Sequence, residues 1–86
     1  MSATVKIYST RFCPYCVRAR SLLDSKGVKY TDIRVDGDVE LRREMVQRSG
    51  RYTVPQIWID TRHIGGYDDL AGLERQGSLN KLLQLA

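Results

Sequence analysis

Both cysteines of the chain lie in one short stretch, Arg11-Phe12-Cys13-Pro14-Tyr15-Cys16. Residues 4–9 before it are rich in β-branched and aromatic residues, which indicates a strand. Apolar residues behind it recur at the spacing of one helical face. Pro14 suits a first helical turn, and the residue before a proline avoids helical geometry. The sequence therefore predicts that Cys13 lies just outside the start of a helix and faces its free N–H groups.

This placement matters because the thiolate is the reactive form of a cysteine. A free cysteine with a pKa of ~8.5 is only about 3% ionised at pH 7. The positive end of a helix dipole and direct N–H···S hydrogen bonds both favour the charged form of a sulfur placed there. Cys16, one turn later, is expected to be more covered and less acidic. We expect Cys13 to attack and Cys16 to resolve.

Size and cysteine content indicate redox chemistry in one small domain covering residues 1–86. Two cysteines this close cannot staple distant segments, so a structural disulfide between them would stabilise little. A C-x-x-C at a strand-to-helix turn is typical of redox sites. The alternatives are a purely structural pair and half of a zinc site. A zinc site needs four ligands, and His63 is the only histidine.

The charge and hydropathy patterns exclude some partners. The net charge is +4, from 14 basic against 10 acidic residues. The basic residues are scattered and not interleaved with aromatic ones, so no nucleic acid is expected; anionic thiols and acidic proteins suit such a surface better. No apolar run has membrane-spanning length and no signal peptide is visible, so we expect no membrane contact and a reducing cytoplasm.

The rest of the chain predicts alternating strands and helices. After a first helix closed by Gly27, residues 28–35 indicate a strand, and residues 39–49 a helix capped by Asp38. That helix is expected to turn Leu41, Met45 and Val46 inward. Residues 56–59 and 62–64 are split by a two-residue turn, which indicates a hairpin.

The C-terminal part is predicted to be helical. Asp68 or Asp69 is expected to cap a helix reaching Arg75, and residues 79–85 form a short last helix. The element order is then β-α-β-α-β-β-α-α. Its βαβ unit implies a parallel pair and its hairpin an antiparallel one. The predicted class is α/β, one mixed sheet with helices on both faces.

Three motifs in this order resemble those of the dithiol glutaredoxins of the short bacterial type, and the resemblance covers nearly the whole chain. They are Cys13-Pro14-Tyr15-Cys16, Thr53-Val54-Pro55 and Gly65-Gly66-Tyr67-Asp68-Asp69. Alone, the second could be an ordinary turn and the third a plain helix start. The resemblance implies a thioredoxin-like fold with a four-stranded mixed sheet flanked by helices on both faces. It also implies a glutathione-dependent thiol–disulfide oxidoreductase.

The resemblance further implies where glutathione, the reducing co-substrate, binds. Pro55 follows a cis peptide bond, and the main chain of Val54, next to Thr53, pairs with the cysteine residue of glutathione. The γ-glutamyl end binds at the start of the helix after Gly66. There the N–H groups suit its carboxylate, and Asp68 and Asp69, beside Tyr67, suit its ammonium group.

Three further glutathione contacts follow from the resemblance. Arg42 is expected to bind the glycine carboxylate, although a solvated helix arginine is the plain alternative. Tyr15 is expected beside the bound glutathione, or as a cover for the disulfide. Many relatives carry a lysine where Thr10 stands, and Arg11 is expected to supply its charge. By contrast, Phe12 and Trp58 are interpreted as packing residues and His63 as a surface strand residue.

The predicted substrates are disulfide-containing or glutathionylated proteins, with ribonucleotide reductase as one family partner, and the chain is expected to act as a monomer. Three other functions stay open. One is a redoxin recharged by thioredoxin reductase, which the Gly65-Gly66-Tyr67-Asp68-Asp69 motif disfavours. Another is a module in which two chains and two glutathiones hold an iron–sulfur cluster, which Pro14 and Cys16 disfavour. The third is a disulfide-donating oxidant.

Overall fold

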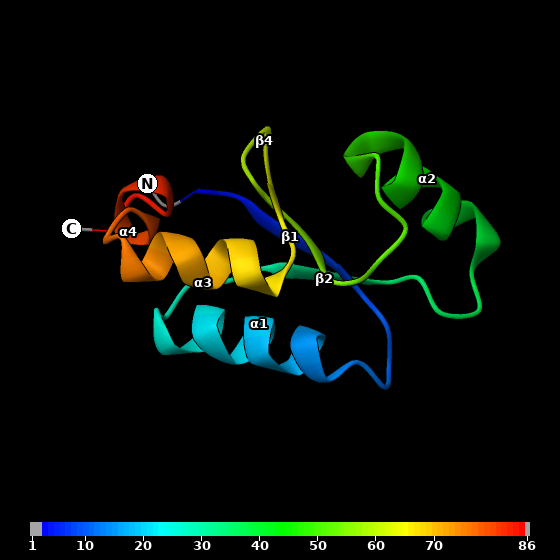
Figure 1. Cartoon of the computed structure of the whole chain (residues 1–86), viewed down its shortest axis with the longest axis horizontal. Helices are drawn as coiled ribbons and strands as arrows, with labels where there is room; N and C mark the ends of the chain where they lie inside the picture. The colour runs from blue at the N-terminus through cyan, green and yellow to red at the C-terminus, as the bar shows by residue number, and fades with distance from the viewer. Residues whose placement is uncertain (1–2, 86) are drawn as a thin grey trace.

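The protein forms a single four-stranded sheet with helices on both faces (Figure 1). The computed structural model describes residues 3–85. Within that range the elements are β1 (Val5–Ser9), α1 (Pro14–Ser25), β2 (Thr31–Arg34), α2 (Val39–Ser49), β3 (Gln56–Ile59), β4 (Arg62–Gly65), α3 (Tyr67–Arg75) and α4 (Leu79–Leu82). The strand order is β2-β1-β3-β4. Strand β1 is parallel to β2 and antiparallel to β3, and β3 is antiparallel to β4. The predicted α/β class with a thioredoxin-like mixed sheet is confirmed.

Each face of the sheet has its own apolar core. Side chains alternate along a strand, so Val5 and Ile7 of β1 face one side and Tyr8 the other. The first side packs against α1, α3 and α4 through buried residues such as Leu23. The second packs against α2, where Met45 is fully buried. Figure 1 shows α1 and α3 running side by side across one face, with α2 on the other. The central strands β1 and β3 are therefore covered on both sides.

Several element predictions need correction. The last helix, predicted over residues 79–85, ends at Leu82, and Gln84 just beyond it has a positive φ of 60° that a helix cannot continue through. The strand predicted over residues 28–35 is only Thr31–Arg34, because β1 offers it a partner over just that length. Val35, just after it, turns into the core beneath α2. The cap of α2 is as predicted, since Asp38 Oδ1 accepts a hydrogen bond from the Leu41 N–H at 3.0 Å. Val46, however, is 36% exposed and does not point inward.

The start of α3 also differs from prediction. Neither Asp68 nor Asp69 is the N-cap, which is Gly66. Asp69, at the third helical position, reaches back instead: its Oδ2 accepts a hydrogen bond from the Gly66 N–H at 2.9 Å. The helix therefore begins at Tyr67 with both aspartates inside its first turn, where their charges suit the helix dipole.

Of three aromatic residues interpreted from sequence, only Trp58 behaves as expected. Trp58 packs edge-on against Tyr8, with ring centroids 5.2 Å apart. Phe12 is 89% exposed and packs into no core. His63 is half-buried, since its ring lies 4.6 Å from that of Trp58. None of the helices in the described part of the chain combines the length and apolar character needed to cross a membrane.

Candidate active site

Cys13 caps the N-terminus of α1. Its backbone is extended, at φ −121° and ψ 106°, and Pro14 is the first helical residue, as the sequence predicts. The Cys16 N–H donates a hydrogen bond to Cys13 Sγ at 3.1 Å. Both cysteines are free thiols, and Cys13 retains 9% exposure. A negative charge on this sulfur would be stabilised by that N–H group and by the helix dipole.

Cys16 has the opposite environment. It is fully buried at the α1–sheet interface. Burial first, and then its hydrogen bond with Cys13, raises the pKa of the Cys16 thiol to about 12, against an opposing effect of the Arg20 charge. Cys16 is therefore a poor nucleophile until Cys13 has become part of a disulfide. The predicted order, in which Cys13 attacks and Cys16 resolves, stays a prediction.

The loop before β3 faces the Cys13 sulfur. The Val54–Pro55 peptide bond is cis, as expected. Cys13 Sγ lies 3.8 Å from the Val54 carbonyl oxygen, with the thiol as donor. These two residues are far apart in sequence, and the antiparallel pairing of β1 with β3 brings them together. A main-chain edge is thus presented beside the sulfur, as β-type pairing with an extended thiol peptide requires.

A buried hydrogen-bond chain holds this loop in place. Gln56 is 1% exposed, and its Nε2 donates to the Thr53 carbonyl oxygen at 3.0 Å and to Thr53 Oγ1 at 3.3 Å. Its Oε1 lies 2.7 Å from His63 Nε2 on β4. Burial, and next the Arg51 charge, lower the pKa of His63, while Asp69 acts in the opposite direction. The hairpin therefore anchors the loop that carries Val54.

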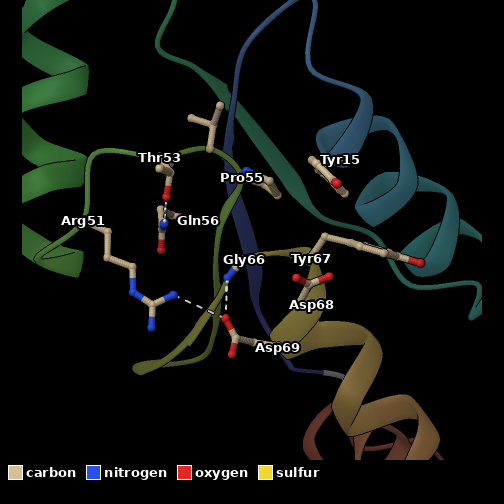
Figure 2. A pocket seen from close by; sticks show the side chains of 10 residues that line it. Tyr15, Arg51, Thr53, Pro55, Gln56, Gly66, Tyr67, Asp68 and Asp69 are labelled. Atoms are coloured by element: carbon tan, nitrogen blue, oxygen red, sulfur yellow. Dashed lines mark hydrogen bonds and ion pairs between the residues drawn. The ribbon is translucent and has the colours of Figure 1, made fainter.

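A pocket of about 210 Å³ opens between this loop, α1 and α3 (Figure 2). It is lined by predicted glutathione-binding residues from all three segments, namely Tyr15, Thr53, Val54, Pro55, Gly66, Tyr67, Asp68 and Asp69. The Tyr15 and Tyr67 rings lie 6.3 Å apart between their centroids. The structure thus brings the three sequence motifs together around one cavity beside Cys13.

Arg51 and Gln56 also line this pocket, and the sequence reasoning missed both. Arg51 Nη1 lies 3.3 Å from Asp69 Oδ2, the oxygen that also accepts the Gly66 N–H. Figure 2 shows the guanidinium group of Arg51 reaching toward Asp69 at the start of α3. A basic residue two positions before Thr53 was the available signal. Gln56 was hidden because it was read only as the start of a strand.

Two predicted residues do not line the pocket. The Arg11 guanidinium carbon lies 5.3 Å from the centroid of the exposed Phe12 ring. Arg42 Nη1 donates to the Tyr52 carbonyl oxygen at 3.3 Å, so it contacts the loop just before Thr53. Their roles in glutathione binding stay predictions.

Comparisons with known proteins show which family this chain is similar to. The glutaredoxin family model matches residues 5–64. The chain is 54% identical to glutaredoxin 3 of Escherichia coli strain K12, over 95% of this chain and 99% of that protein. It is 54% identical to a glutaredoxin of Pseudomonas aeruginosa, over 92% of this chain and 94% of that protein. The solution structure of glutaredoxin from Brucella melitensis superposes on this chain with a TM-score of 0.85 at 49% identity, over 95% of this chain and 89% of that one. The crystal structure of a buckwheat glutaredoxin–glutathione complex superposes on this chain with a TM-score of 0.88 at 30% identity, over 98% of this chain and 83% of that one.

A thioredoxin-like sheet with a C-x-x-C pair at a helix N-terminus defines a class, the thiol–disulfide oxidoreductases of this fold. Within that class, the chain belongs to the glutaredoxin family. Glutaredoxins are glutathione-dependent thiol–disulfide oxidoreductases, so the family and function predicted from the sequence are confirmed.

Proposed function

We propose that the pocket binds glutathione with its sulfur at Cys13. The 3.8 Å distance between Cys13 Sγ and the Val54 carbonyl oxygen carries this proposal. An extended tripeptide pairing with the Val54 main chain would have its own sulfur beside Cys13. The similarity to a buckwheat glutaredoxin solved as a glutathione complex supports the same ligand.

The charged ends of glutathione have suitable partners at either end of that main-chain edge. At α3, the N–H groups of the first turn suit the γ-glutamyl carboxylate, and the exposed Asp68 suits the ammonium group. Asp69 is already paired with Arg51, so we assign it a positioning role in that turn. At the other end we propose Arg42 for the glycine carboxylate and Arg11 as a further positive charge near the thiol.

In the one-cysteine reaction, the Cys13 thiolate attacks the glutathione sulfur of a protein–glutathione disulfide. The protein leaves as a thiolate, and Cys13 holds glutathione. A second glutathione thiolate then attacks the held glutathione sulfur. Oxidised glutathione leaves and the Cys13 thiolate is restored, so the two electrons come from two glutathiones.

In the two-cysteine reaction, Cys13 attacks one sulfur of a protein disulfide and forms a mixed disulfide with it. The Cys16 thiol, deprotonated as it reacts, attacks Cys13 Sγ and releases the protein as a dithiol. The resulting Cys13–Cys16 disulfide is reduced by two glutathiones. The hydrogen bond between the two cysteines, 3.1 Å from Cys16 N to Cys13 Sγ, shows that they lie within one turn of each other.

Disulfide-containing and glutathionylated proteins are the proposed substrates, and ribonucleotide reductase is one candidate. We propose that residues 1–86 act as one domain and as a monomer. We also propose the cytoplasm as the compartment, since a glutathione reductant fits a reducing environment.

Reduction of the mixed disulfide of glutathione and 2-mercaptoethanol, coupled to glutathione reductase, tests this proposal. Wild type should be active, Cys13→Ser inactive, and Cys16→Ser should keep this activity while losing most reduction of protein disulfides. Cys16→Ser losing both activities would contradict the assigned roles. Recycling by thioredoxin reductase in place of glutathione would favour the alternative redoxin function.

A further inference from the structure

Two exposed apolar side chains lie close to Cys13 in the chain. Phe12 is 89% exposed and Val17 is 50% exposed. Neither lines the pocket. Scattered apolar residues on a surface are ordinary, but a nearly bare phenylalanine next to a nucleophile offers a large apolar area to whatever approaches that sulfur. Figure 1 shows the β1–α1 loop at the opposite end of the molecule from α4.

Two positive charges accompany these apolar side chains. The guanidinium carbon of Arg11 lies 5.3 Å from the Phe12 ring centroid, and that of Arg18 lies 5.3 Å from the Tyr15 ring centroid. Neither arginine belongs to an ion pair within residues 3–85, whereas Arg51, for example, is paired. The sequence has four basic residues and no acidic one before Asp24. This end of α1 therefore has uncompensated positive charge.

We propose that Arg11, Phe12, Val17 and Arg18, here called the docking rim, bind a segment of a partner protein in which carboxylates flank an apolar side chain beside the oxidised cysteine. Phe12 and Val17 would cover the apolar side chain, while the arginines attract the carboxylates. This inference rests on the proposed function and adds to it the class of protein substrate. A neutral segment would gain the apolar contact alone, and a basic segment would also be repelled by the two arginines.

The rim and the pocket can be occupied together. No rim residue lines the pocket, and Tyr15, which does, lies against the rim, with its ring centroid 5.3 Å from the Arg18 guanidinium carbon. A glutathionylated protein would then place its glutathione in the pocket and its own chain on the rim. Apart from Arg11, which we also assign to glutathione binding, the two parts of one mixed disulfide would be recognised by different residues. Substitutions of Phe12 and Arg18 should therefore spare small substrates.

Three substrates separate these contributions: the mixed disulfide of glutathione and 2-mercaptoethanol, a glutathionylated Ser-Glu-Leu-Cys-Leu-Glu-Ser peptide, and the same peptide with lysine in place of glutamate. Wild type should have the higher kcat/KM for the glutamate peptide, and added salt should narrow the difference. Phe12→Ser should lower kcat/KM for that peptide about fivefold to tenfold. Arg18→Glu should remove most of the preference for the glutamate peptide, because it leaves the rim with one positive and one negative charge. Both variants should leave the small substrate within about twofold of wild type.

Matched controls are Val39→Ser, a 70% exposed apolar residue on α2, and Lys29→Glu, an exposed lysine beyond the far end of α1. Neither should alter the peptide preference. Equal wild-type rates for the two peptides, or an equal loss on all three substrates in Phe12→Ser, would overturn the docking rim. Loss of wild-type activity on the small substrate would instead refute the proposed function.

A binding measurement tests the docking rim independently of the proposed function. Peptides carrying serine in place of cysteine are titrated into the protein and followed by amide chemical shifts. The glutamate peptide should shift residues 11–18, and Arg18→Glu should abolish that response. Shifts confined to other parts of the chain, or a response unchanged in Arg18→Glu, would overturn the inference whatever the activity shows.

Discussion

Alkylation of the two cysteines by iodoacetamide should differ sharply, because Cys16 is fully buried with a thiol pKa of about 12. At pH 7 such a thiol is ionised in about one molecule in 10⁵, whereas a free cysteine is about 3% ionised, a difference of roughly 3.5 powers of ten. A more basic thiolate is a better nucleophile, with a Brønsted slope of about 0.4–0.5, which recovers about 1.5 of those powers. Cys16 should therefore react about 100-fold more slowly than a free cysteine, before its burial restricts access.

Single-cysteine variants measure this by mass spectrometry. In Cys13→Ser the hydrogen bond and charge of Cys13 are gone, but burial, the largest cause of the raised pKa, stays. Labelling of Cys16 in that variant should still be at least about tenfold slower than that of a free cysteine. Cys16→Ser should be labelled readily. In concentrated urea the two variants should react alike, which serves as the control. If iodoacetamide labelled Cys16 of the Cys13→Ser variant at the same rate with and without urea, the assignment of Cys16 as a buried resolving thiol would be refuted.

Three further substitutions test the surroundings of the site. Gly65→Ala should lower the free energy of unfolding in urea by more than about 1 kcal/mol, because φ is +117° and a Cβ would approach Asp69 Cγ to 2.8 Å. His63 has a lowered pKa in the folded protein, so the unfolded chain binds its proton more readily. The free energy of unfolding should therefore fall as pH drops below about 6.5, and His63→Asn should flatten that dependence. Asp38→Ala removes the cap of α2 and should cost about 1 kcal/mol, lowering Tm by about 4–8 °C.

Each of these expectations has a comparison that isolates its cause. Gly77→Ala also acts at a positive φ, +76°, but its Cβ would meet no atom within 4 Å. A loss as large as that of Gly65→Ala would show that the Asp69 contact is unimportant. Asp36→Ala, in the turn before α2, should change stability by less than about 0.5 kcal/mol. Parallel pH profiles for wild type and His63→Asn would contradict the role of His63.

Local chemistry made much of this structure predictable. Pro14 fixed the start of α1 and hence the place of Cys13, and Asp38 marked the start of α2, because both effects act within one turn. The length of β2 was not predictable from its own residues, since it depends on how much of β1 is there to pair with it. Phe12 was assigned to packing by residue type alone, although it lies in a turn that meets no other element.

The site, like the fold, was predictable from the sequence only in part. The motif residues gather as the resemblance implies, but the contact of Arg51 with Asp69 joins residues 18 positions apart. That contact exists only after β4 and α3 have been placed against the loop before β3, and no periodicity or spacing indicates it. The buried link from His63 through Gln56 to Thr53 is likewise a product of the hairpin pairing. Both long-range contacts support the loop that faces Cys13.

The two outer segments of the described chain meet at the end of the molecule opposite the start of α1 (Figure 1). There the Ala3 N–H donates a hydrogen bond to the Leu83 carbonyl oxygen at 3.4 Å. The longest dimension of the molecule is 38 Å. A redox-sensing fluorescent protein joined to either segment would consequently leave the sulfur open to its substrates. A circularly permuted version, with residues 3 and 83 bridged by a short linker and new ends cut elsewhere, should also retain the fold.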